Sequence, residues 1–382
     1  MPKTESWLEH GDALQAVIEY RIKSEYATLK FLERTSVPAP RAFGYGLRCG
    51  GPGADHGVGV SFILMEELPG RPWYGGGEPP EDEETKRKEE RLFAQLADVL
   101  AELARWPFDK AGSLTVREEE GARKEKGGGG GDRVEEVVVL GPQMGDRFAV
   151  LDPEGPYETA EDYYAAWAEQ HLELIADGQL YTEYPVDAYL TYRFLADNVG
   201  QMLEEPTKGK KKKEQFFLKH IDDNGQHILV DDDYNITGII DWEYARTVPR
   251  HEAFGASTVT AEMDALYNRE WTLPGLSVRD RVLIEALENR GSPELARLIC
   301  DERARRLFWG LALEPTGDGA ERLANEILKA FGVKETWDEW REEAIRRYSD
   351  KRLRRLLRRE KARAVKSEPY HLRSLAGKQG RH

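Results

Sequence analysis

The stretch that most constrains the fold of this chain is Phe216–Ala245, which reads FFLKHIDDNGQHILVDDDYNITGIIDWEYA. Two short apolar runs, Ile228–Val230 and Ile236–Ile240, flank the polar segment Asp232–Asn235. Apolar runs on both sides of a short polar, Asp- and Asn-containing turn are typical of two antiparallel strands joined by a tight connection. The stretch therefore predicts a β-hairpin around which the rest of the chain must be arranged.

The predicted hairpin brings two acidic residues together. With the turn centred in the polar segment, simple pairing places His227 opposite Ile240. Asp241 then lies beside the loop Asp222–Gln226, at the open end of the hairpin. Transfer of a phosphoryl group uses such a pair: one carboxylate orients and deprotonates the attacking hydroxyl, and another holds the metal ion that bridges the nucleotide phosphates. Asp222 suits the first role and Asp241 suits the second.

These residues resemble a known family. The run His220-x-Asp222, the ILVD strand that ends at Asp231 and the IIDWE run that contains Asp241 resemble the aminoglycoside phosphotransferase-like branch of the protein-kinase-like fold. That family's pattern is H-x-D-x-x-x-x-N-I-L-V-D, followed by I-I-D-W/F-E. At the position of the family's metal-binding Asn, this chain has His227. Loops of the form H-x-D-D-x-G-x-H are similar to those of fungal members, so we interpret His227 as a feature of that branch.

The resemblance implies a fold and an activity. The fold would be α+β and two-lobed, with a truncated N-lobe and a mainly helical C-lobe that carries the catalytic hairpin. The activity would be transfer of the γ-phosphoryl group of ATP to a hydroxyl of a small molecule. Asp222 would be the catalytic base and His220 a structural residue that fixes the catalytic loop.

His227 leaves several outcomes open for the metal site. Mg²⁺ prefers hard oxygen ligands, and an imidazole replaces an amide oxygen poorly. Asp223 or Asn224 could supply the missing oxygen, or Asp241 and His227 together could favour Mn²⁺. The remaining alternative is weak metal binding in a catalytically silent kinase-like module that binds a partner.

Residues 1–68 are expected to form a partial N-lobe. Apolar residues recur at helical spacing over 12–34. The segment SEYATLKFLERTSVPAP resembles the family's N-lobe helix, which implies that Glu25 orients a phosphate-binding Lys or Arg; a solvated helix position is the alternative. No G-x-G-x-x-G phosphate loop occurs, and Lys3 is the upstream candidate for the base. We therefore expect a truncated N-lobe or a misassigned start.

The run 58–68, VGVSFILMEEL, resembles the strand and hinge that join the two lobes. In the family, the hinge backbone hydrogen-bonds the adenine. The resemblance therefore implies nucleotide contacts by Met65, Glu66 and Leu68, with Met65 at the rear of the pocket. Ordinary core packing is the alternative for Met65.

Residues 69–349 are expected to form the C-lobe, with a flexible Gly-rich insertion over 118–133. The Lys208–Lys213 cluster predicts a solvated loop, with attraction of an anionic partner as the alternative. The basic tail 350–382 predicts a solvated helix, and a nuclear-localisation signal is the alternative. Helical patterns cover the segments 86–105, 159–178, 186–203, 278–313 and 320–348.

Composition narrows the class of protein. The chain has 382 residues, of which 40% are hydrophobic and 33% charged, so a sizeable core is available. A net charge of −15 argues against a general nucleic-acid binder. Cys49 and Cys300 form no C-x-x-C pair, which favours a reducing compartment over a disulfide framework. Without a signal core or a long apolar run, we expect a cytoplasmic protein with a small-molecule partner and no membrane contact.

Overall fold

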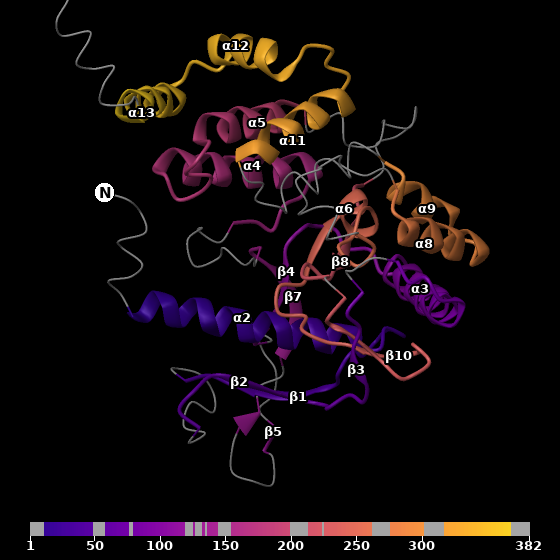
Figure 1. The fold of residues 1–382 in the computed structure, drawn as a ribbon. Coiled ribbons are helices and arrows are strands. Elements are labelled where there is room, and N and C mark those ends of the chain that lie inside the picture. The colour runs from indigo at the N-terminus through magenta and orange to yellow at the C-terminus, as the bar shows by residue number, and fades with distance from the viewer. Residues whose placement is uncertain are drawn as a thin grey trace, which may run out of the picture. The chain divides into compact units, whose positions relative to one another are not determined.

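The computed structural model contains two compact units. The first combines Met1–Tyr163 with Leu203–Phe308, and the second combines Tyr164–Met202 with Trp309–His382. Figure 1 follows the chain through both units. The structure describes residues 11–48, 58–75, 79–118, 125–126, 132–133, 136–143, 154–198, 213–223, 225–261, 276–301 and 317–367.

Helix α2 (Gly11–Leu32) is the N-terminal helix of the described chain and confirms the helix predicted over 12–34. Its apolar positions repeat with helical spacing, and Leu29 is fully buried among them. The helix ends at Leu32, whose carbonyl oxygen accepts a hydrogen bond from Thr35 Oγ1 at 2.8 Å. This side-chain bond satisfies one of the carbonyl groups that a helix end leaves without a backbone partner.

A two-stranded antiparallel sheet contacts α2. Strand β1 (Ala42–Gly46) pairs with β2 (Phe62–Met65), and both strands run close to the helix in Figure 1. The apolar run predicted over 58–68 thus forms a strand only in its central part. The residues after β2 lead directly to the short strand β3 (Arg71–Pro72), which sequence patterns did not predict because two residues carry no periodicity.

A second hairpin packs against α2. Strand β4 (Ser113–Glu118) pairs in continuous register with β7 (Glu136–Gly141). The hydroxyl of Tyr20 on α2 donates to the carbonyl oxygen of Pro142 at 2.6 Å and ties the helix to this hairpin. Two short paired strands lie between β4 and β7: β5 (Glu125–Lys126) and β6 (Asp132–Arg133). The polyglycine run predicted to be flexible lies outside the described residues.

The predicted central hairpin is present. Strands β9 (Ile228–Val230) and β10 (Ile236–Ile239) are antiparallel, and β3 extends them to a sheet of order β10-β9-β3. Ile240 N donates to the carbonyl oxygen of His227 at 2.9 Å, so the predicted pairing of these two residues is confirmed. Nearer the turn the register shifts between Ile236 and Gly238, which simple pairing did not anticipate.

The strands on either side of this hairpin also pair with each other. β8 (Phe216–Lys219) is antiparallel to β11 (Arg246–Pro249) in unbroken register, with Arg246 opposite Lys219. All four residues of β8 are buried, so the chain enters the hairpin from the core. This pairing brings the chain that follows Asp241 back beside β8. The segment 216–249 therefore forms one compact substructure.

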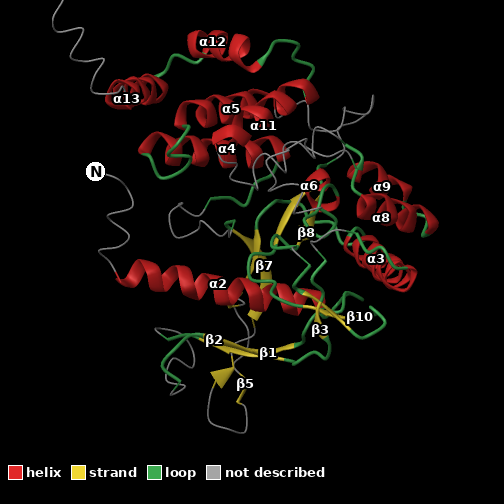
Figure 2. Cartoon of the chain, in the orientation of Figure 1, coloured by secondary structure: helices red, strands yellow, loops and turns green. Residues whose placement is uncertain are grey.

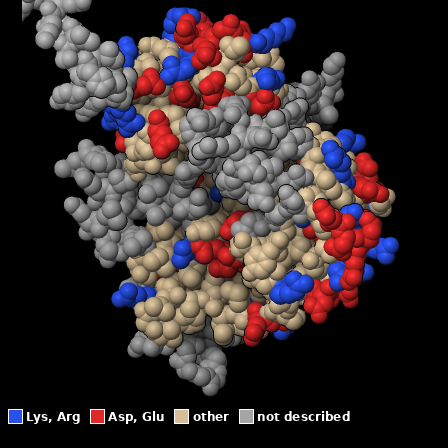
Figure 3. Space-filling model, viewed as in Figure 1, with Lys and Arg blue, Asp and Glu red and all other residues tan. Residues whose placement is uncertain are grey.

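Helix α3 (Glu83–Leu103) supports the hairpin from outside. Asp82 caps it by accepting a hydrogen bond from Thr85 N at 2.8 Å. Its apolar face is buried, with Leu92 and Phe93 fully inaccessible. Acidic and basic side chains lie together on the exposed surface in the region of this helix, as Figure 3 shows, and Lys88 pairs with Glu84 one turn away.

Helix α8 (Val278–Asn289) packs on α3. The contact contains a buried bidentate ion pair, in which Arg279 Nε and Nη2 donate to the Glu89 carboxylate at 3.1 and 2.9 Å. The helical pattern predicted over 278–313 is interrupted, because Gly291 adopts a φ of +75° before Pro293 begins α9 (Pro293–Ile299). A five-residue helix, α6 (Arg250–Phe254), follows β11.

The described part of the second unit consists of helices, as Figure 2 shows. Helix α4 (Ala160–Asp177) confirms the helical pattern predicted over 159–178, and Thr159 Oγ1 accepts from Asp162 N at 3.1 Å at its start. The remaining helices are α5 (Pro185–Asn198), α11 (Gly317–Ala330), α12 (Trp337–Arg347) and α13 (Lys351–Ser367). None of the helices that the structure describes is long and apolar enough to cross a membrane.

Helix α13 contains most of the basic residues of the tail. It packs on α5 and buries Leu353 and Leu356, so the predicted solvated helix has one apolar face in the core. The prediction missed this face because the leucines lie among many arginines, whose long side chains keep their charges in water while their stems cover apolar surface. Of the predicted lysine cluster, Lys213 pairs with Asp109 at 2.8 Å, and the other members lie outside the described residues.

Candidate active site

The open end of the hairpin brings the two predicted carboxylates to one imidazole. Nε2 of His227 lies 3.4 Å from Oδ2 of Asp241 and 3.9 Å from Oδ2 of Asp222. His227 is largely buried, whereas the side chains of Asp222 and Asp241 are about half exposed, at 53% and 48%. The site is therefore open to solvent on its acidic side and closed behind the imidazole.

A hydrogen bond to the backbone fixes the tautomer of His227, and so determines which ring nitrogen carries the lone pair. Its Nδ1 lies 2.8 Å from the carbonyl oxygen of Asp222. A carbonyl oxygen can only accept, so Nδ1 carries the proton and donates. In the neutral imidazole, Nε2 then carries the lone pair and lies next to the Asp241 carboxylate. A nitrogen and a carboxylate oxygen arranged in this way can bind the same cation.

His220 lies behind this group and joins the loop to the hairpin. Its Nε2 donates to the carbonyl oxygen of Ile240 at 2.9 Å, and its ring lies edge-on to Trp242 with centroids 4.8 Å apart. Burial lowers the pKa of His220, so the imidazole is neutral at neutral pH. This hydrogen bond holds the residue directly before Asp241.

Asp241 has an unusual backbone conformation. Its φ is +65°, in the left-handed region that Asp tolerates better than most residues. The next residue, Trp242, is buried, and its indole N–H donates to the carbonyl oxygen of Ile239 at 2.8 Å. The chain therefore turns sharply after β10, and the buried indole keeps Asp241 in this conformation.

Helix α2 contributes charges to the same site. Burial raises the pKa of Glu25 to about 7, and the nearby charges of Asp241 and Glu243 raise it as well, whereas Arg21 lowers it. Arg21 Nη1 lies 3.0 Å from Glu243 Oε1. The structure thus brings the predicted Glu25 close to Asp241. Arg21 and Glu243 were not predicted. Arg21 lies one helical turn before Glu25, and Glu243 lies two residues after Asp241, so their spacing from these predicted residues could have indicated them.

Of the predicted hinge residues, Met65 ends β2, and Glu66 and Leu68 lie between β2 and β3. Met65 is half-buried and pairs with Ala42. The backbone N–H of Glu66 donates to the carbonyl oxygen of Arg41 at 2.9 Å. Leu68 packs on β10, where a Cβ on Gly238 would lie 2.4 Å from Leu68 Cδ1, so only glycine permits this approach. The segment after β2 therefore contacts the hairpin directly.

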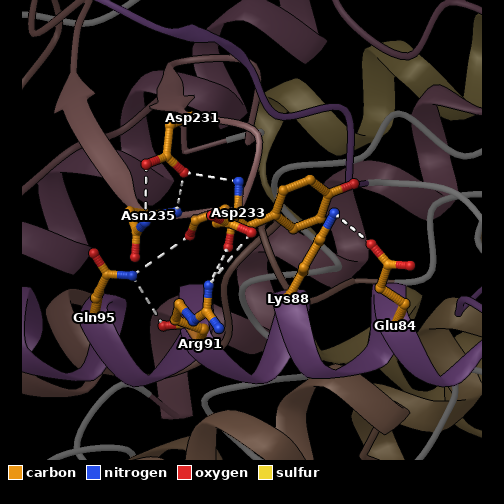
Figure 4. Close-up of polar contacts among 8 residues, drawn as sticks. Glu84, Lys88, Arg91, Gln95, Asp231, Asp233 and Asn235 are labelled. Carbon is orange, nitrogen blue, oxygen red and sulfur yellow. Dashed lines mark hydrogen bonds and ion pairs between the residues drawn. The ribbon is translucent and has the colours of Figure 1, made fainter.

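The turn of the hairpin, at its other end, is held by α3. Oδ1 of Asp231 accepts from the backbone N–H groups of Asp233 and Asn235, both at 2.9 Å. Arg91 Nη1 donates to the carbonyl oxygen of Asp233 at 3.0 Å, and Gln95 Oε1 accepts from Ile236 N at 3.0 Å. Figure 4 shows these α3 side chains directed at the turn. The pattern of acidic turn residues predicted the turn but not these partners.

The donor atoms at the site fit a metal ion whose remaining ligands come from a nucleotide. Within the described ranges, no group of three or more His, Cys, Asp or Glu side chains is arranged to hold a metal by itself. Asp223, considered above as an oxygen ligand, already accepts hydrogen bonds from Ser257 and Thr258, and Asn224 lies outside the described residues. Mg²⁺ and Mn²⁺ commonly bind one or two protein groups plus phosphate oxygens, and the nitrogen of His227 suits Mn²⁺ better.

The mixed helix and sheet architecture places a carboxylate-bearing hairpin beside the segment that follows β2, as expected for the α+β fold class predicted from the sequence. A family model described as the phosphotransferase enzyme family, APH, matches residues 19–276. The chain belongs to this family, and the predicted α+β protein-kinase-like fold class is confirmed. Its assignment to the fungal branch stays a prediction.

Solved structures similar to this chain include aminoglycoside phosphotransferase APH(4)-Ia. It is 15% identical, with a TM-score of 0.39, covering 81% of this chain and 83% of that chain. A thermostable mutant of APH(4)-Ia in ternary complex with AMP-PNP and hygromycin B is 17% identical, with a TM-score of 0.38 and coverage of 81% and 83%. Similarities of this size bear on neither substrate nor mechanism. No curated protein matches the sequence.

Proposed function

We propose that this protein transfers the γ-phosphoryl group of ATP to a hydroxyl of a small molecule. The observation that carries the proposal is that Asp222 and Asp241 both lie within reach of one imidazole nitrogen, at 3.9 and 3.4 Å, in a chain of the phosphotransferase family. Phosphoryl transfer relies on positioning and charge stabilisation rather than on covalent chemistry by the protein. An acid pair held by a rigid hairpin supplies that positioning.

Each acidic residue then has a separate task. Asp222 is half exposed and, as the proposed base, accepts the proton of the acceptor hydroxyl as that oxygen approaches from solvent. Asp241 and Nε2 of His227 would hold the metal, which would supply the positive charge that neutralises the phosphates. His220 keeps Asp241 in place through the carbonyl of Ile240.

The residues on the nucleotide side come from α2 and the hinge. Glu25 orients a cation for the phosphates, and Arg21 on the same face of α2 is the cation whose charge acts on it. Met65, Glu66 and Leu68 form the adenine side. The N–H of Glu66 already donates to the carbonyl oxygen of Arg41. At this residue, the adenine would therefore be bound by the carbonyl oxygen of Glu66.

A thermal-shift titration with ATP and either Mg²⁺ or Mn²⁺ tests the proposal. A phosphotransferase should be stabilised by millimolar nucleotide with at least one metal, because a ligand that binds only the folded state raises its melting temperature. A chain that shifts with neither metal would instead be the silent kinase-like module.

Asp222→Asn separates binding from chemistry. The substitution removes the proton acceptor but leaves the proposed metal ligands, so the ATP-dependent thermal shift should persist. Turnover should fall by about 10²–10⁴-fold, the usual contribution of a positioned base. The assay is ATP consumption over a panel of hydroxylated metabolites. Asp232→Asn, at an exposed position in the hairpin turn, is the control. Wild-type turnover by Asp222→Asn would exclude Asp222 as the base.

A further inference from the structure

The loop that carries Asp222 is tied to the segment 257–261 through its next residue, Asp223. Ser257 Oγ donates to Asp223 Oδ2 at 2.6 Å, and Thr258 Oγ1 lies 2.7 Å from Asp223 Oδ1. The same Thr258 hydroxyl lies 2.6 Å from the backbone carbonyl oxygen of Asp223. A hydroxyl has one proton, so Thr258 shares it between these two acceptors. Asp223 is thus held through both its side chain and its backbone.

This attachment acts on the backbone of Asp222. The carbonyl oxygen of Asp222 accepts from His227 Nδ1 at 2.8 Å, and the next carbonyl along the chain, that of Asp223, accepts from Thr258. Two consecutive carbonyl groups are therefore fixed, one from within the loop and one from outside it. Together they set the direction in which the Asp222 side chain leaves the backbone.

The segment that holds Asp223 is itself rigid. Thr260 Oγ1 donates to Asp280 Oδ1 at 2.6 Å, and Ser277 Oγ donates to the carbonyl oxygen of Thr260 at 2.7 Å. Ser277 and Asp280 form the capping box at the start of α8, and all three residues are buried. Hydrogen bonds this deep in the protein are costly to break. The loop is consequently anchored to the first turn of a packed helix.

We propose that Asp223 is a positioning residue for the phosphoryl transfer proposed above, with Ser257 and Thr258 as its anchor. The inference rests on that proposed function. The family pattern H-x-D-x-x-x-x-N leaves this position unspecified, and within the described residues the two hydroxyls contact the loop of Asp222 through Asp223. Their effect is on geometry: a reacting group misplaced by about 1 Å loses on the order of 10²-fold in rate.

Three variants test the anchor. Thr258→Val keeps the shape of the side chain and removes the hydroxyl, Thr258→Ser keeps the hydroxyl, and Thr191→Val removes a hydroxyl that donates to the Asp187 carbonyl oxygen within α5. Two measurements are made on each full-length variant. The first is ATP hydrolysis to ADP with Mn²⁺ or Mg²⁺, with kcat and KM for ATP determined separately. The second is hydrogen exchange of the peptide that covers residues 220–230.

Thr258→Val should lower kcat by about tenfold or more while KM for ATP stays within about twofold, because placement of the base changes and nucleotide contacts do not. Exchange in 220–230 should accelerate in this variant alone. Thr258→Ser and Thr191→Val should resemble the wild type in both measurements. Unchanged exchange in Thr258→Val, or faster exchange with wild-type kcat, would overturn the inference. So would an equal loss of kcat in Thr258→Ser.

The same experiment separates failure of the inference from failure of the proposed function. A wild-type protein that neither hydrolyses ATP nor shifts its melting temperature with ATP refutes the phosphotransfer proposal, and the positioning role for catalysis falls with it. A wild-type protein that turns over ATP at a rate unaffected by Thr258→Val refutes only the role of the anchor.

Discussion

At the residue scale, His227 is the position where this chain departs from the pattern of its family. Its Nδ1 is committed as a donor to the Asp222 carbonyl, which leaves Nε2 directed at Asp241. An imidazole nitrogen is a better ligand for Mn²⁺ than for Mg²⁺. In the proposed metal site, the choice between Mg²⁺ and Mn²⁺ would therefore depend on this one side chain, and a single substitution should change it.

His227→Asn should shift the metal preference toward Mg²⁺. An Asn amide supplies an oxygen ligand in place of nitrogen, so the ratio of ATP affinities with Mg²⁺ and with Mn²⁺ should rise on the order of tenfold. Thermal-shift titrations with each metal measure the ratio without requiring turnover. His251→Asn, which changes a histidine paired with Asp301, is the control. An unchanged ratio in His227→Asn would remove His227 from the metal site.

Glu25 makes stability depend on pH. Its pKa rises from 4.5 to about 7 on folding, so between these values the folded chain binds the proton more strongly than the unfolded chain. The free energy of unfolding should therefore fall as the pH rises from about 4.5 to 7. Allowing for partial exposure, the loss is about 1–3 kcal/mol.

Glu25→Gln should abolish this dependence. Since Gln stays neutral, the variant should be about 1–3 kcal/mol more stable than the wild type at pH 8 and nearly equal to it at pH 5. Urea denaturation at both pH values measures the difference. Glu19→Gln, on the same helix and beside Gln15, is the matched control. A constant difference between Glu25→Gln and wild type at both pH values would contradict the raised pKa.

At the scale of elements, the hairpin is held at both ends by polar contacts from helices. α3 holds its turn through Arg91 and Gln95, and α8 holds its open end through the segment that contains Ser257 and Thr258. α3 and α8 are in turn joined by the buried pair of Glu89 and Arg279. The hairpin is extended only by the two-residue strand β3, and so small a sheet is marginally stable alone, so these attachments determine how precisely the site is built.

Gln95→Ala should loosen the turn. It removes the acceptor for Ile236 N and the donor to the carbonyl oxygen of Tyr234, and should cost about 1–2 kcal/mol in the free energy of unfolding. Chemical denaturation measures this cost, and hydrogen exchange of the Ile236 amide localises it. Glu90→Ala, at an exposed position of α3, should change neither quantity beyond about 0.5 kcal/mol. Equal effects of the two variants would show that Gln95 does not hold the turn.

At the scale of the whole molecule, the candidate site and the basic tail belong to different compact units. Glu25, Met65, Asp222, His227 and Asp241 all lie in the first unit. The second unit is built by α5 and its helical neighbours, and α13 completes it. Tyr189 on α5 donates to Asp350 at 2.8 Å, and Arg341 pairs with Glu360 of α13 at 3.0 Å.

Leu353→Ala should destabilise the second unit. Leu353 is fully buried where α13 packs on α5, so its truncation leaves a cavity and should cost about 2–5 kcal/mol. The unfolding transition followed by circular dichroism in urea measures the loss. Arg358→Ala, at an exposed position of the same helix, should stay within about 0.5 kcal/mol of wild type. If both variants unfold like the wild type, α13 is a solvated tail after all.

Much of the site followed from local patterns in the sequence. The hairpin, the pairing of His227 with Ile240, the helix that carries Glu25 and the proximity of Asp222 to Asp241 all depend on spacing and turn chemistry over a few residues. Such features are determined locally because side-chain alternation and turn residues act within one element. The register shift near Gly238 was not predictable, since it depends on how closely Leu68 packs.

Only the tertiary structure decided which distant residues complete the site. Arg21 meets Glu243, Gln95 meets Ile236, and Thr258 meets Asp223 across stretches of chain that carry no common period. These partners are selected by packing, because a hydrogen bond or ion pair forms wherever folding brings complementary groups within reach, whatever their spacing. The sequence by itself thus determined the acidic residues and the hairpin that presents them, and the packed helices decided what holds that hairpin in place.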